Sequence, residues 1–247
     1  MMFLANASSS EIVKRQYLFK LRAFIGAFIA LMLAQWTALG LSILSGSGMT
    51  GTSSGNLFIK ITYFNGNLLI TFTLLWAFTT GITLTTKQTR NGDFAFVTNR
   101  LTSHLSSITF LLTAGMIAGI TTMLASNLLR VGIAFFSDGN SFLNHSFSVS
   151  FLELIMGILA TTLYTVLIAS IGYLIGMFVQ LSKLFVIVIP GLFIALTIGG
   201  TNSSLEHIFK FFTNETSLFL FAIKVLTTIS IFFATAILIS NRLEVRR

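Results

Sequence analysis

The chain has 247 residues, of which only 9% are charged and 54% are hydrophobic, with 26 phenylalanines. An ordinary soluble domain carries about 25% charged residues, so this composition argues against a soluble globular enzyme. The mean hydropathy of +0.90 indicates that the chain is built for lipid. Cysteine is absent, which excludes disulfides, thiol nucleophiles and cysteine-ligated metals.

Six segments are long and apolar enough to suggest membrane spans, because a spanning helix needs roughly 20 mostly apolar residues. In chain order they cover residues 23–44, 61–84, 107–129, 154–179, 184–199 and 217–240. The fifth is short and contains Pro190, and the polar stretch 201–216 behind it carries an apolar stripe. We therefore expect an all-α polytopic membrane protein, a single domain over residues 1–247, with a broken or re-entrant outer element between spans five and six.

The basic residues predict the orientation of this bundle. Eleven of the 15 lysines and arginines fall before span one, between spans two and three, between spans four and five, or after span six. With three acids on the same side, that side carries +8 (11 minus 3), and the other side carries 0 (4 minus 4). The positive-inside rule then places both termini in the cytoplasm. The net charge of +8 is thereby explained as orientation, and no nucleic-acid partner is expected.

Three connections carry further expectations. Residues 11–21 mix basic and large apolar side chains and predict an interfacial helix leading into span one. Residues 45–60 are rich in Gly, Ser and Thr and predict a flexible linker. In the cytoplasmic loop 85–106, Asp93 is a candidate helix N-cap, and Phe94, Val97 and Leu101 recur at helical spacing. That pattern predicts a short amphipathic helix, which either packs on the bundle or docks a cytosolic partner.

Polar residues inside spans are candidates for translocation or for packing. Glu153 suits a helix-start or snorkelling role better than a proton or substrate site. Lys224 either snorkels outward, serves a buried function, or lies before the true start of span six. Gln35, Asn65 and Asn67 are more typical of interhelical hydrogen bonds than of ligand sites, and Pro190 interrupts span five.

No catalytic, cofactor or metal motif is found. The three histidines are scattered over predicted loops, and no Walker A spacing exists, so the chain is not expected to be an enzyme or to bind ATP itself. Gly115-x-x-x-Gly119 and Gly172-x-x-x-Gly176 allow close approach of helices.

The layout resembles the permease subunit of ABC-2-type transporters, the small six-helix bacterial exporter permeases of the bacteriocin-immunity and peptide-efflux type. The local likeness lies in residues 93–107, where Phe94, Phe96, Thr98, Arg100, Thr102 and Ser103 are similar to the aromatic run and the Ser/Thr-Arg segment before span three of these permeases. The family's proline is missing here. The resemblance implies that this loop is a coupling helix, with Asp93, Phe94, Phe96, Val97, Arg100 and Leu101 as residues that dock an ATPase.

The resemblance further implies a bacterial cytoplasmic membrane, a separate ATPase subunit that binds ATP and Mg, and a dimer with a second permease copy or a sister permease. The cargo would be amphipathic: a peptide, bacteriocin, lipid-like molecule or drug. The alternative from a different class is a membrane scaffold or sensor subunit that recruits a cytosolic partner without transport. A secondary transporter would be expected to show an inverted repeat and midplane charges, and neither is clear in the sequence.

Overall fold

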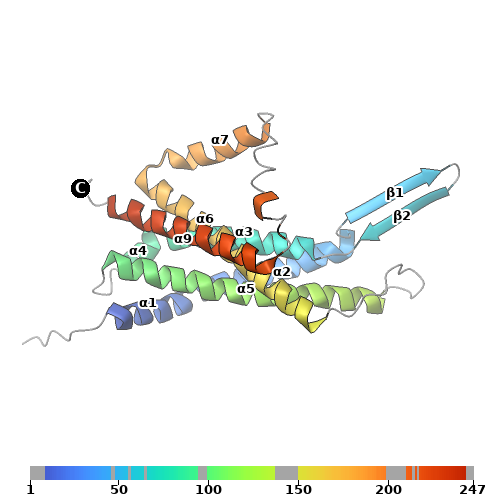
Figure 1. The fold of residues 1–247 in the computed structure, drawn as a ribbon, viewed down its shortest axis with the longest axis horizontal. Helices are drawn as coiled ribbons and strands as arrows, with labels where there is room; N and C mark the ends of the chain where they lie inside the picture. Colours follow the sequence, from blue (N-terminus) through green and yellow to red (C-terminus); the bar gives the residue numbers. More distant parts are fainter. Residues whose placement is uncertain are drawn as a thin grey trace, which may run out of the picture.

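The computed structural model describes residues 9–45, 48–54, 57–63, 66–93, 99–136, 150–198, 210–212, 215 and 217–242. The chain is predominantly helical, as expected, and Figure 1 shows the helices gathered in an elongated bundle. The helices are α1 (Ser9–Ala23), α2 (Ile25–Ser45), α3 (Asn67–Leu84), α4 (Lys87–Asp93), α5 (Arg100–Phe136), α6 (Phe151–Leu181), α7 (Phe185–Ile198) and α9 (Leu218–Arg242). Two strands, β1 (Gly48–Ser54) and β2 (Leu57–Tyr63), complete the described elements.

Within the described residues, five helices are long and apolar enough to cross a membrane: α2, α3, α5, α6 and α9. The sixth expected span is α7, which has only 14 residues. At 1.5 Å per residue it is about 21 Å long, shorter than the roughly 30 Å hydrocarbon core. The predicted bounds of span two also need correction, because the helix begins at Asn67 and not at residue 61.

The segment between α2 and α3 forms a β-hairpin in place of the expected flexible linker. β1 and β2 pair antiparallel, with Gly48 opposite Tyr63 and Ser54 opposite Leu57. Strand β2 has the sequence LFIKITY, whose β-branched and aromatic residues favour extended backbone. The hairpin extends from one end of the bundle (Figure 1). The Gly/Ser/Thr-rich strand β1 is extended because it pairs with β2, which follows it directly in the sequence.

The first two helices run alongside α5 as one nearly continuous rod. Together they cover 37 positions (45 minus 9, plus 1), and α5 also has 37 residues. Contacts from Lys20 to Ser106 and from Gln35 to Thr121 both join residues 86 positions apart, so the rod and α5 are parallel and in constant register. Helix α1 leads into α2, as the sequence suggested, and packs on the first turns of α5. Its position at the membrane interface stays a prediction.

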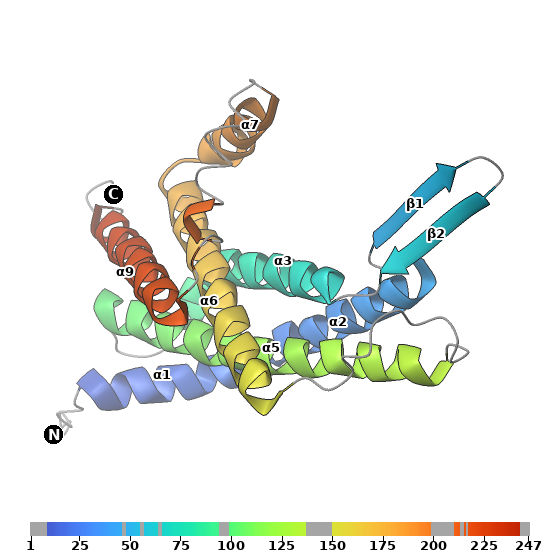
Figure 2. The same ribbon diagram turned by 45° about the vertical axis from the view of Figure 1, so that its right-hand side comes forward.

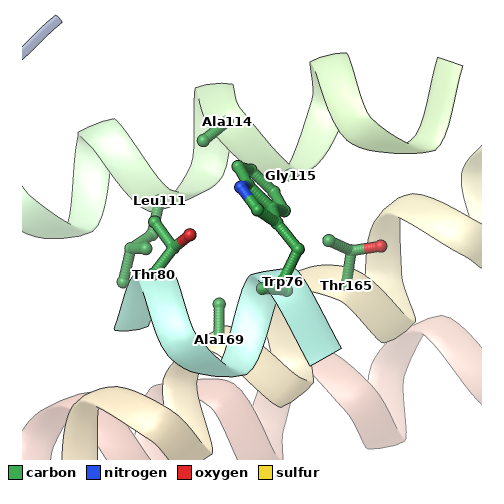
Figure 3. Close-up of a pocket in the computed structure, with 8 residues that line it drawn as sticks. Trp76, Thr80, Leu111, Ala114, Gly115, Thr165 and Ala169 are labelled. Atoms are coloured by element: carbon green, nitrogen blue, oxygen red, sulfur yellow. The ribbon is translucent and has the colours of Figure 1, made fainter. Parts of the chain in front are cut away.

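The core lies where α3, α5, α6 and α9 meet, with α2 packed on the α3 and α5 side. Two predicted glycine contacts are found there: a Cβ at Gly119 would collide with the Thr162 side chain, and one at Gly172 would collide with the Phe78 carbonyl oxygen. In Figure 3, Trp76 of α3 points toward Ala114 and Gly115 of α5, with Thr165 and Ala169 of α6 beside it. The gap between them has no room for a water molecule.

The segments predicted to share one side of the membrane lie together. Figures 1 and 2 show the start of α1, helix α4, the start of α5, the end of α6 and the end of α9 at the same end of the bundle. The hairpin and the end of α5 lie at the opposite end. We call the first of these the basic end, because it holds the segments that carry most of the lysines and arginines.

Candidate functional site

The main polar cluster of the described residues surrounds Lys20 at the basic end. Lys20 lies on α1, is 1% exposed, and points at α5. Its ammonium donates hydrogen bonds to the Ser106 hydroxyl at 2.8 Å, the Ser107 hydroxyl at 2.7 Å and the Ser103 carbonyl at 3.2 Å. One turn earlier, Gln16 is also fully buried, and neither of its amide atoms has a hydrogen-bond partner among the described residues. At this point α1 contacts α5 through polar side chains, whereas packed helices usually meet along apolar faces.

The first turns of α5 are also tied to two other helices. The Arg100 guanidinium donates to the Ser240 carbonyl of α9 at 2.7 Å. His104 Nδ1 lies 2.7 Å from the Tyr173 hydroxyl of α6, and the two rings meet edge to face. Both His104 and Tyr173 are buried. The start of α5 is thus joined by hydrogen bonds to α1, α6 and α9, so these four helix ends form one connected unit.

The six predicted docking residues are only partly brought together. Phe94, Phe96 and Val97 lie outside the described residues. Asp93 is the last residue of α4, so its predicted role as the N-cap of the next helix is wrong. Arg100 and Leu101 open α5, and Leu101 is 52% exposed. The sequence predicted a short amphipathic helix here. From Arg100 onward these residues instead belong to the long helix α5, which continues without a break to Phe136.

Gln35 forms the interhelical hydrogen bonds that its position in span one suggested. Its side-chain amide donates to the Thr121 hydroxyl at 3.0 Å and the Thr122 hydroxyl at 3.1 Å, both on α5. Thr122 in turn bonds Thr73 of α3 at 2.9 Å. Buried polar groups in a spanning region stabilise a bundle when they are paired in this way, so Gln35 has a packing role.

The other predicted polar residues have local roles or lie outside the described chain. The Glu153 carboxylate accepts a hydrogen bond from the Ser150 backbone amide at 3.2 Å, which is the helix-start role. Asn67 is the first residue of α3 and its carbonyl accepts a bond from Thr71. Pro190 lies within α7 and is exposed. Asn65 is outside the described residues.

Lys224 forms a second polar site on the flank of α9. It makes an ion pair with Glu215, and its ammonium lies 4.4 Å from the centre of the Phe211 ring. The Tyr164 hydroxyl of α6 donates to the Phe212 carbonyl at 2.9 Å, and the Tyr164 ring packs on Phe221 of α9 at 4.9 Å. Phe211, Phe212 and Glu215, which precede α9, thereby contact α6 or α9.

Sequence reasoning missed three of these groups. Lys20 was counted only as one of the basic residues of the N-terminal segment, although Gln16 and Lys20 share a helix face at i and i+4. His104 was placed in a loop, yet it is buried on α5. Glu215 was counted only as a charge on the outer side. The spacing of Ser103, Ser106 and Ser107 on one face of a helix was the signal that could have indicated a buried polar contact.

In the part of the chain that the structure describes, no three His, Cys, Asp or Glu side chains are grouped so as to hold a metal ion. What the arrangement can do is hold helix ends together and expose a charged, partly aromatic site on α9. No known protein family, curated protein or solved structure matches the chain.

Proposed function

We propose that the chain is the transmembrane permease subunit of an ATP-driven exporter of the ABC-2 type in a bacterial cytoplasmic membrane. The basic end would face the cytoplasm and meet a separate ATPase subunit, which binds ATP and Mg. A second permease copy or a sister permease would complete the dimer. The cargo would be amphipathic. Five membrane-spanning candidates and the collection of basic segments at one end support this proposal.

The observation that carries the proposal is the set of hydrogen bonds at the start of α5. Lys20, Arg100 and His104 connect it to α1, α9 and α6. A partner that binds between α4 and α5 in the sequence would act on all four helix ends at once. Export needs such a connection, because the bundle has to alternate between two packed arrangements when ATP binds and is hydrolysed below it.

The test is ATP-dependent export in inverted membrane vesicles that contain this chain and a co-expressed candidate ABC ATPase subunit. A fluorescent amphipathic peptide serves as the cargo. We expect uptake of the peptide into the vesicles when ATP is supplied, and no uptake with a non-hydrolysable analogue. Complex formation without any ATP-driven uptake would contradict the export proposal and favour the scaffold alternative.

Arg100→Ala sharpens the same assay, since it removes the hydrogen bond between α5 and α9. We expect uptake of the peptide to fall. Because Arg100 is also one of the predicted docking residues, binding of the ATPase is measured by pull-down beside uptake, and retained binding assigns the loss to the bond with α9. Arg22→Ala is the matched control, because Arg22 is an exposed basic residue of α1. Equal loss of uptake in both variants would indicate a general effect of positive charge and not of the bond to α9.

A further inference from the structure

The Lys224 site lies far from either end of α6. Tyr164 comes 13 residues after α6 begins at Phe151 (164 minus 151), which is about 20 Å along the helix. Its ring packs on Phe221, three residues after the start of α9. Helix α9 therefore begins beside the middle of α6 (Figure 2), and the Lys224–Glu215 ion pair is at that height. Lys224 is an ionisable residue inside a candidate membrane span, and such a residue is a candidate functional site.

The groups around the Lys224 ammonium are those that recognise a cation. A carboxylate, Glu215, supplies the opposite charge, and the face of the Phe211 ring supplies a cation–π contact. Phe212 packs edge to face on Phe211 at 5.0 Å and steadies that ring. Lys224 thus occupies, from within the chain, a site that would equally accept an ammonium or guanidinium group of another molecule.

Lys224 can leave this site, in contrast to a lysine held in a core. The Lys224 side chain is 32% exposed and the Glu215 side chain 22% exposed. A lysine has a flexible four-carbon stem, so its ammonium can move outward while the stem stays against the helix. The surface beside the site is apolar, with Phe211, Phe219 and Leu220 between 51% and 72% exposed. A ligand with a cationic head and an apolar body matches both parts.

We propose that Glu215 and Phe211 form a binding site for cationic amphiphiles, such as a hydrophobic peptide or alkyl chain that carries a primary ammonium or guanidinium group. Lys224 occupies the site when it is empty and is displaced when the ligand's cation binds. That the site takes up the exported molecule rests on the proposed function. The binding itself does not, since it needs only this chain.

Binding is tested with the purified full chain in nanodiscs of zwitterionic lipid, without any ATPase. The probe is a long-chain alkylammonium with a fluorescent label, and the alcohol of the same chain length and label is the uncharged control. Lys224→Met removes the internal competitor, and we expect the alkylammonium to bind about fivefold more tightly. Glu215→Gln and Phe211→Leu remove the recognising groups, and we expect each to weaken binding by about fivefold, as loss of a partly exposed cation contact implies. The alcohol should bind all variants alike.

Opposite effects of Lys224→Met and Glu215→Gln on binding of the alkylammonium distinguish a ligand site from a purely structural ion pair, whose loss would not tighten binding in one variant and weaken it in the other. Lys210→Met is the control for general electrostatics, because Lys210 is an exposed basic residue of the same segment. If Glu215→Gln does not fold, the double variant Glu215→Gln/Lys224→Met is used, because it leaves neither charge unpaired. We expect this double variant to bind the alkylammonium no better than the alcohol. The proposal is overturned if Lys224→Met fails to tighten binding, or if it tightens binding no more than Lys210→Met does. If the wild-type chain binds the probe as expected but shows no ATP-driven export, the result counts against the proposed transport function and not against the binding site.

Discussion

Lys20 and Lys224 both make side-chain contacts with residues outside their own helices, and their surroundings differ. Lys20 is 1% exposed and donates to two hydroxyls and a carbonyl. Lys224 has a side chain that is 32% exposed and pairs with a carboxylate and an aromatic ring. A buried ammonium depends on every acceptor around it, whereas a partly exposed one can exchange partners. Burial therefore separates a lysine that holds helices from one that occupies a binding site.

The strongest test of this contrast removes the acceptors of Lys20. The double variant Ser106→Ala/Ser107→Ala leaves the buried ammonium with two fewer hydrogen bonds, and bonds to charged groups contribute about 1.5–3 kcal/mol each. We expect the free energy of unfolding to fall by roughly 3–5 kcal/mol, measured by chemical denaturation in detergent micelles. Ser230→Ala, at an exposed position of α9, is the matched control and should change stability by at most about 0.5 kcal/mol.

Lys20→Met provides the complement to that experiment. It removes the charge, and both serine hydroxyls keep their bonds to the Ser103 carbonyl. The loss should be smaller than in the double serine variant, and the triple variant should recover most of the stability, because an apolar replacement of a buried charge is often neutral. A triple variant as unstable as the double would show that the ammonium is not what makes the serines important.

Two tyrosines extend the comparison to uncharged groups. Tyr173→Phe removes the partner of buried His104 Nδ1 and should cost about 1–2 kcal/mol of unfolding free energy. Tyr164→Phe removes the bond to the Phe212 carbonyl, which lies beside the partly exposed site, and should cost less than about 1 kcal/mol. Thermal unfolding of both variants in the same detergent measures the difference. Equal losses of unfolding free energy would mean that the burial of a hydrogen bond does not determine how much it stabilises the chain.

The sequence predicted the elements of this molecule better than their contacts. Long apolar runs indicated α2, α3, α5, α6 and α9 because length and hydropathy are local properties. The hairpin was missed because strand pairing joins two segments, and β1 alone reads as a linker. The Lys224–Glu215 contact depends on where α9 begins along α6. That position follows from the packing of the two helices and cannot be predicted from either segment alone.

The same distinction applies to the polar residues. Gln35 was expected to bond another helix because an amide in a span needs a partner, but which helix it meets follows from the parallel register of α2 and α5. Lys20 looked like a surface charge because lysines usually are. Only the packing of α1 on α5 revealed its acceptors. Residue chemistry thus predicts that a partner is needed, and tertiary structure decides which one.

A double-mutant cycle on Lys224 and Glu215 measures the coupling free energy of an ion pair that is more exposed than Lys20 and less exposed than the surface pair on α1. Each single neutral variant, Lys224→Met or Glu215→Gln, leaves one charge beside apolar side chains and is expected to lower the unfolding free energy by about 1 kcal/mol. The double variant should be close to wild type, so the coupling free energy, which is the departure of the double variant from the sum of the two single variants, should be about 2 kcal/mol. A coupling as large as that of the Lys20 cluster would show that the pair is not exchangeable, and would weaken the case for a ligand site.

The smallest effect is expected for the ion pair between Arg15 and Glu11 on the outer face of α1. The two groups are 2.7 Å apart, but their side chains are 70% and 50% exposed, so water and salt screen them. Removing both with Arg15→Gln and Glu11→Gln should give a coupling free energy of at most about 0.5 kcal/mol. That coupling should vanish as the salt concentration rises, whereas the effect of the Ser106→Ala/Ser107→Ala variant should persist, because its charge is out of reach of ions. Salt dependence of the serine variant, or its absence for the exposed pair, would contradict the ranking by burial.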